Sequence, residues 1–235
     1  MRRARIAGSF FLAALLAACA PQDVRPPASA AVPDPAATLE RRYDAMAQVG
    51  VPVFVVDPTR STVILEVRRA GSLANLGHDH VMSSHDLRGF AAPSTGRADV
   101  YFRADALTVD EAPLRAAAGF DTQPTDSDIA GTRRNMLARV LHADEHPFVL
   151  ASVAGVDVGG GGGERTLHAV FTVNGVEHAA DARAQVAREP EELHVKGESV
   201  IRQTDFGIRP FSILGGALEV ADAVTVKFDI VARRR

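Results

Sequence analysis

The sequence predicts a mainly β protein, a closed or nearly closed antiparallel barrel with one internal α-helix. Several segments alternate apolar and polar residues, as strands with one buried and one wet face do. Turn-forming residues separate these segments, and one internal segment has the apolar spacing of a helix instead. The stretch from about residue 52 to residue 235 has the length of one ordinary domain.

Four segments show the strand pattern most clearly. In each, the apolar residues share one face: Val63, Leu65, Val67; Val100, Phe102, Ala104, Ala106; Leu167, Ala169, Phe171, Val173; and Val224, Val226, Phe228, Ile230. We expect the face that carries the phenylalanines to point inward. Asn174-Gly175 suits a tight hairpin or a short break at that point, and Gly159 to Gly163 suits a flexible hairpin tip.

The helical segment lies between residues 126 and 146. Its apolar residues fall on one face at helical spacing: Ile129, Met136, Leu137, Val140 and Leu141. Asp126 or Ser127 is the candidate cap, and Pro147 prevents the helix from continuing. A second, short helix is expected from Leu39 to Val49.

Residues 1–18 have the three parts of a bacterial lipoprotein signal peptide. A basic start (Met1 to Arg5) precedes an apolar run (Phe10 to Leu16) that is too short to span a bilayer. The run ends in Leu16-Ala17-Ala18-Cys19, which has the form of a lipobox. We therefore expect Cys19, the only cysteine, to be lipidated, although an ordinary secretory signal is the alternative. Ala20 after this cysteine favours a periplasm-facing protein of the outer membrane.

Residues 19–51 are expected to form a tether ahead of the barrel domain at 52–235. Residues 20–38 are rich in proline and alanine and have too few large apolar side chains to fold alone. The net charge is −3, and cleavage before Cys19 would remove three arginines and make it −6. This acidity argues against nucleic acid as a partner.

The segment LANLGHDHVMSSHD, residues 73–86, has the highest density of chemically active side chains. In an extended chain, His78 and His80 project to the same side, with His85 further along. Three interpretations remain open. The histidines could bind Zn²⁺ or Cu²⁺, cap a polar barrel mouth, or contact a phosphate or quinone oxygen of a ligand.

No catalytic residue is predicted. His142-Ala143-Asp144-Glu145-His146 matches a zinc-peptidase signature, but that chemistry needs both histidines on one continuous helix. Pro147 pushes His146 away from helical dihedrals, so we interpret the match as a coincidence.

The order of motifs resembles the YceI-like family of bacterial periplasmic proteins. The resemblance is carried by Phe54 to Pro58, Ser61 to Val63, Ala70-Gly71, Ala143 to Phe148, Ala151-Ser152, Phe171 to Val176 and Ile201 to Ile208. It implies a lipocalin-like barrel of about eight strands whose apolar interior holds an isoprenoid or another lipid-like chain without acting on it. The histidine-rich segment is an addition that the family pattern does not require.

These considerations define an expected site. The predicted ligand-contacting residues are Phe102, Ala104, Phe171, Phe206, Phe211 and Phe228, with His78 and His80 near one rim. Beyond a bound lipid, no cofactor is expected. The rival interpretation is a zinc- or copper-binding protein or metalloenzyme that uses His78, His80 and His85. The sequence leaves open whether the barrel forms a homodimer.

Overall fold

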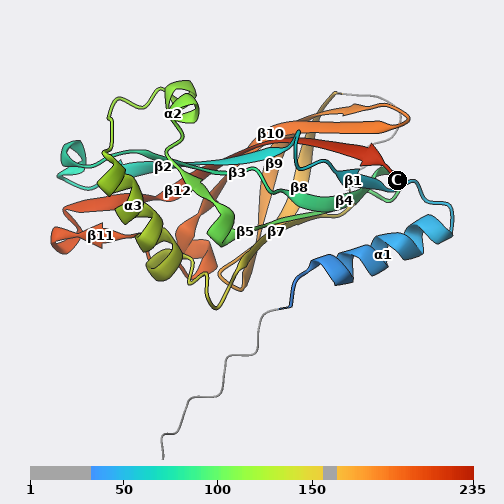
Figure 1. Cartoon of the computed structure of the whole chain (residues 1–235), viewed down its shortest axis with the longest axis horizontal. Helices are drawn as coiled ribbons and strands as arrows, with labels where there is room; N and C mark the ends of the chain where they lie inside the picture. The colour runs from blue at the N-terminus through green and yellow to red at the C-terminus, as the bar shows by residue number, and fades with distance from the viewer. Residues whose placement is uncertain (1–32, 156–162) are drawn as a thin grey trace, which may run out of the picture. The chain divides into compact units, whose positions relative to one another are not determined.

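The computed structural model describes residues 33–155 and 163–235. Within these ranges, the strands form one antiparallel sheet that closes on itself (Figure 1). The strands are β1 (Phe54–Val56), β2 (Thr62–Ala70), β3 (His80–Ser84), β4 (Arg88–Ala92), β5 (Arg97–Arg103), β6 (Thr108–Val109), β7 (Phe148–Val153), β8 (Gly163–Val173), β9 (Val176–Arg188), β10 (Glu192–Arg202), β11 (Ser212–Ile213) and β12 (Leu218–Arg234).

The sheet is an eight-stranded barrel because three pairs of short strands each occupy one position. β1 and β2 follow one another along the same edge of β12. β4 pairs with β1 and β3 pairs with β2, which fills the next position. β5 then pairs with β4, and β6 pairs with β3. β7, β8, β9, β10 and β12 supply the other positions. The predicted barrel of about eight antiparallel strands is confirmed.

The expected alternation places apolar side chains inside the barrel. Across β2 and β12, Val63 lies opposite Phe228 and Leu65 lies opposite Val226. The prediction fails at one point, since β5 ends at Arg103 and Ala104 to Ala106 form a 3-10 turn. The strand alternation does not extend through such a turn, so Ala104 and Ala106 do not continue the inward face of β5.

The Asn174-Gly175 hairpin forms as predicted. Val173 pairs with Val176, so the turn has two residues, and both adopt positive φ (52° and 72°) as a type I′ turn requires. The expected hairpin tip at Gly159 to Gly163 lies outside the described residues except for Gly163, where β8 begins.

The predicted internal helix is α3 (Asp126–Asn135), which runs directly into a π-helix at Met136–Val140. Its cap is Thr125, one residue before the predicted cap. The Thr125 hydroxyl accepts a hydrogen bond from the Asp128 N–H, and the Asp128 carboxylate accepts one from the Thr125 N–H. This is a capping box, in which the third residue of the helix completes the cap.

Two further α-helices contact the outside of the barrel. α1 (Ala36–Gln48) begins three residues earlier than expected and packs through Leu39 and Tyr43, both buried. The Tyr43 hydroxyl donates to the buried Asp99 carboxylate at 2.9 Å. The folded region therefore begins before residue 52. α2 (Ala112–Ala118) was not predicted, because seven residues are too few for a periodic pattern.

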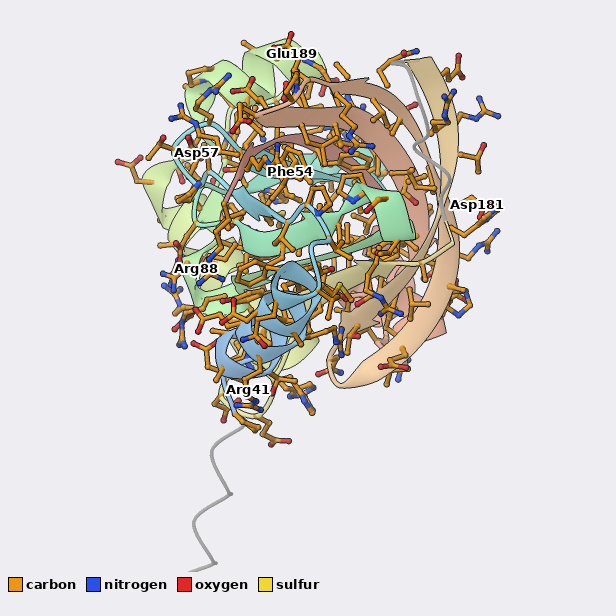
Figure 2. The ribbon with its side chains drawn as sticks, turned by 90° about the vertical axis from the view of Figure 1, so that its right-hand side faces the viewer. Arg41, Phe54, Asp57, Arg88, Asp181 and Glu189 are labelled. Carbon is orange, nitrogen blue, oxygen red and sulfur yellow. The ribbon has the colours of Figure 1, made fainter. Side chains whose placement is uncertain are left out.

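The predicted signal peptide and Cys19 lie outside the described residues. Across 33–155 and 163–235, no helix is long and apolar enough to cross a bilayer. The barrel has two different ends (Figure 1). We call the end that carries α3 and β11 the α3 end, and the end where β12 finishes near the C-terminus the C-terminal end. Figure 2 looks at the C-terminal end, where Phe54 lies among the strands and Arg41, Arg88 and Asp181 lie towards the outside.

Candidate ligand-binding site

The barrel encloses a cavity of about 660 Å³. This volume falls within the range of about 300–1,000 Å³ that is typical of small-molecule sites. Inward residues from all eight strand positions line it. Small side chains at Ala91, Ala98, Ala151, Ala169 and Ala182 face the cavity and leave part of the barrel interior unfilled.

The structure brings together all but one of the predicted ligand-contacting residues. The cavity is lined by Phe102, Phe171, Phe206, Phe211 and Phe228, and by His78 and His80. Ala104 is the exception. It is fully buried, but it lies in the 3-10 turn after β5 and does not line the cavity. Contact between the other seven residues and a ligand stays a prediction.

Polar groups of the cavity wall gather mainly at the α3 end. His78 and His80 lie there beside Thr132 and Asn135 of α3, while Met136 and Val140, further along the same segment, present apolar side chains. The cavity is therefore polar at one end and apolar along most of its length. The polar helix residues were missed, because only the apolar spacing of this segment was considered.

His80 is held by a buried carboxylate. Its Nδ1 lies 2.6 Å from Asp110 Oδ2, and the Asp110 side chain is fully buried. The other oxygen, Asp110 Oδ1, accepts from the Val81 N–H at 3.0 Å and from Arg115 Nη1 at 2.6 Å. Burial alone would raise the pKa of Asp110, but the hydrogen bonds from His80, Val81 and Arg115 outweigh burial and lower it.

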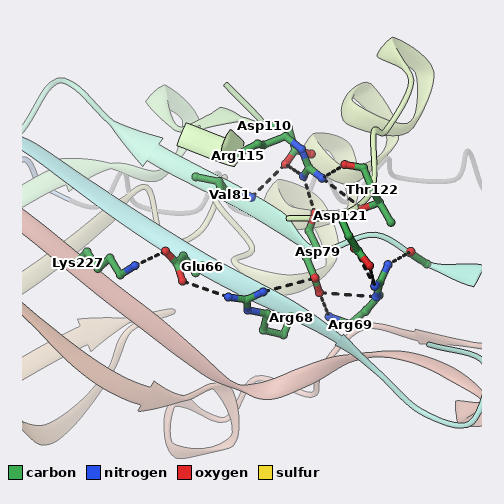
Figure 3. A network of polar contacts seen from close by, with 11 residues as sticks. Glu66, Arg68, Arg69, Asp79, Val81, Asp110, Arg115, Asp121, Thr122 and Lys227 are labelled. Atoms are coloured by element: carbon green, nitrogen blue, oxygen red, sulfur yellow. Dashed lines mark hydrogen bonds and ion pairs between the residues drawn. The ribbon is translucent and has the colours of Figure 1, made fainter. Parts of the chain in front are cut away.

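Arg115 connects this carboxylate to the outer layer. Besides Asp110, its guanidinium donates to the main-chain oxygens of Asp79 and Thr122, each at 2.5 Å. Figure 3 shows these contacts, together with a second row of charges along β2 that runs from Lys227 through Glu66 and Arg68 to Asp79. The buried charges are thus paired. Through Arg115, α2 is hydrogen-bonded to the residue that precedes β3, the strand that carries His80.

His78 lies next to His80 but has different partners. The two rings are 6.2 Å apart between centroids. His78 Nε2 is 3.9 Å from Asp128 Oδ2, which is too long for a hydrogen bond. His78 Nδ1 is buried, and it has no hydrogen-bond partner in the described part of the chain. One ring nitrogen of His78 is therefore buried and unsatisfied among the described residues.

The predicted three-histidine metal set does not assemble. His85 Nε2 pairs with Glu111 at 2.8 Å, and its side chain is exposed, whereas His80 faces the cavity. His80 begins β3 and is held by Asp110, whereas His85 follows the last residue of that strand and is held by Glu111. Among residues 33–155 and 163–235, no three His, Cys, Asp or Glu side chains are grouped as metal ligands.

The zinc-peptidase match at His142 to His146 has no helical geometry. The π-helix ends at Val140, His142 adopts a φ of 42°, and the His146 N–H bonds back to the His142 oxygen within a turn. The His146 ring packs against the hairpin glycine, Gly175. The arrangement agrees with the interpretation that this match is a coincidence.

Comparisons with known proteins agree with the fold. Residues 54–232 match the family model of the YceI-like domain. A structure described as a polyisoprenoid binding domain from Saccharophagus degradans, implicated in plant cell wall breakdown, is 13% identical with a TM-score of 0.55, covering 77% of this chain and 98% of that one. BcnA from Burkholderia cenocepacia is 14% identical with a TM-score of 0.53, covering 75% and 98%. No curated protein matches the sequence.

Proposed function

This chain belongs to the YceI-like domain family, and from that premise we propose that its barrel binds a long aliphatic amphiphile of the polyisoprenoid class without transforming it. The observation that carries the proposal is the cavity of about 660 Å³, which is apolar along most of its length and polar at the α3 end. A long apolar chain would gain roughly 25 cal/mol per Å² of surface removed from water there.

The shape of the site supports this class of ligand. Phenylalanine side chains from β5, β8 and β12 line the wall together with aliphatic residues, and the polar groups near α3 suit the head of an amphiphile. The structurally similar domain from Saccharophagus degradans is described as polyisoprenoid-binding, which makes this class the first to test.

Extraction of the purified chain with organic solvent, followed by mass spectrometry, tests the proposal. We expect a lipid with a long isoprenoid or comparable aliphatic chain. The variant Ala169→Phe adds a ring to the cavity wall and should lose the lipid. Ala179→Phe is the matched control, because Ala179 is exposed on the neighbouring strand β9 and does not line the cavity. A wild-type extract without lipid, with no uptake of added polyisoprenoid, would contradict the proposal.

We further propose that the chain is lipidated at Cys19 and held at the periplasmic face of the outer membrane. The support is the basic start, the short apolar run and the lipobox of residues 1–19. In cells fed labelled palmitate, the wild type should carry the label and sediment with the outer membrane. Cys19→Ser should lose both properties, and a label that persists in this variant would contradict the anchor.

A further inference from the structure

The hydrogen-bond geometry around His80 specifies one kind of head group at the polar end of the cavity. Asp110 lies in contact with two cationic or N–H donors besides His80, and it is fully buried. A carboxylate in this setting is ionised and accepts hydrogen bonds only. The contact of 2.6 Å between His80 Nδ1 and Asp110 Oδ2 therefore requires the proton to be on Nδ1.

The second ring nitrogen then becomes an acceptor. In a neutral imidazole with the proton on Nδ1, Nε2 carries a lone pair. His80 lines the cavity, and its Nε2 lies 3.4 Å from the hydroxyl of Thr132 on α3. This separation is longer than an ordinary hydrogen bond, so a better placed hydroxyl group would replace Thr132.

His78 lies beside His80 at this end of the cavity. Its Nδ1 is buried with no partner among the described residues, and its ring lies 6.2 Å from that of His80 between centroids. A buried polar atom without a partner is costly, but this nitrogen has almost no accessible surface, so contact with a ligand head group falls to His80.

The charges at this end argue against an anionic head group. Arg69 lines the cavity here, but its guanidinium already makes two contacts of 2.9 Å with Asp121 and one of 3.0 Å with the Gly77 oxygen. A second arginine of the cavity lining, Arg97, begins β5 at the C-terminal end of the barrel. Asp128 and Glu219 line the wall near α3 and would repel a phosphate.

We infer that the polar end of the cavity recognises the hydroxyl group of a long-chain isoprenoid alcohol, which donates its proton to His80 Nε2. This inference rests on the proposed function and narrows it from amphiphiles in general to alcohols over their phosphate esters. Asp110 and Arg115 act as positioning residues, since they fix the imidazole so that it presents an acceptor to the cavity.

Binding of three probes with the same chain tests the inference: farnesol, farnesyl methyl ether and farnesyl phosphate. Affinities of the full chain are measured by displacement of a fluorescent apolar probe, above the usual titration range of imidazole. We expect farnesol to bind roughly three- to tenfold more tightly than the ether, which cannot donate a hydrogen bond. The phosphate should bind more weakly than the alcohol.

Variants of His80 test whether this residue causes the preference for the alcohol over the ether. His80→Phe should remove the preference for the alcohol over the ether. His80→Gln retains an amide oxygen and should keep part of the preference. His85→Phe, whose exposed side chain lies outside the cavity wall, is the control and should bind like the wild type. If His80→Phe does not fold, two measurements still test the inference. These are the affinities of the wild type for the alcohol and the ether, and the same two affinities for His80→Gln.

The outcomes separate the two proposals. Equal binding of alcohol and ether, or tightest binding of the phosphate, would overturn the inference while leaving a lipid-binding barrel in place. Failure of all three probes to bind would instead count against the proposed function itself.

Discussion

Asp110 illustrates how much one side chain can determine. It follows the two-residue strand β6, adopts a φ of 59°, and exchanges hydrogen bonds with the main chain of Val81 on β3. The same carboxylate holds His80 on the cavity side and Arg115 on the outer side. A buried charge with several partners contributes to specificity of structure, and its loss leaves the partner charge unpaired.

Asp110→Asn should destabilise the fold. The substitution leaves the buried Arg115 guanidinium without its carboxylate, and we expect the free energy of unfolding to fall by about 3–5 kcal/mol. Urea denaturation followed by circular dichroism measures the change. Asp144→Asn, at an exposed position in the turn before β7, is the control and should change stability by less than about 0.5 kcal/mol. Equal stability of the two variants would show that the buried pair contributes little.

At the scale of single residues, the sequence supports part of the site. The alternation in β5, β8 and β12 is sufficient to place Phe102, Phe171 and Phe228 on the inner face. The partner of His80 could not be predicted, because Asp110 lies thirty residues away and reaches it only after β6 pairs with β3. Ala104 was misplaced, since nothing in the sequence marks the end of β5 before the 3-10 turn.

Among the elements, α3 contributes both polar and apolar residues to one end of the cavity. The helix begins at a capping box and ends in a π-helix, and its cavity-lining residues change from polar to apolar along this length. A π-helical segment shifts the residues that follow it around the helix axis, which is a common feature near functional sites. Apolar spacing predicts such a helix, but it does not reveal the extra residue of the π-turn or the seven-residue α2.

Gly131→Ala should stabilise α3. Gly131 lies in the middle of the helix, and a methyl group there would meet only the tip of Arg134 at 3.8 Å. Glycine inside a helix costs about 0.5–1 kcal/mol relative to alanine, so we expect a gain of that size in the free energy of unfolding. Thermal and urea unfolding measure it.

Gly175→Ala provides the contrast with this substitution. Gly175 has a φ of 72°, and a new Cβ would lie 2.8 Å from the His146 ring. We expect a loss of about 1 kcal/mol or more. A gain of stability in both variants would mean that the hairpin tolerates an L-residue and that His146 moves aside.

For the whole molecule, closure of the sheet into a barrel creates the internal cavity. The broken strand positions, β1 with β2 and β3 with β4, were not predicted, because each break depends on how neighbouring strands pair. Alternation and turn residues predict an antiparallel barrel, and the number of about eight strands comes from the family resemblance. Closure is a property of the complete sheet, and the pairing of β1 with β12 joins residues that are far apart in sequence.

Acid should weaken the fold as a whole. The pKa of each of these carboxyl groups is lowered, largely by hydrogen bonds and nearby cations: Asp57, Asp105, Asp110, Glu111, Asp128, Glu192, Asp222 and Asp229. Such groups stabilise the fold fully above their unfolded pKa, at about 4, and lose this contribution as pH falls through the lowered folded value. Urea denaturation at successive pH values should show stability declining below about pH 4. A flat profile down to about pH 3 would contradict this expectation.

The position of β12 at the end of the described chain has a consequence for when the barrel can close. This strand of 17 residues pairs with β10 on one side and with β1 and β2 on the other, and it occupies residues 218–234. A nascent polypeptide that has not yet extended this far possesses two unjoined edges and no enclosed volume. The enclosed cavity can therefore form only after residues 218–234 have been synthesised and have paired with both neighbouring edges.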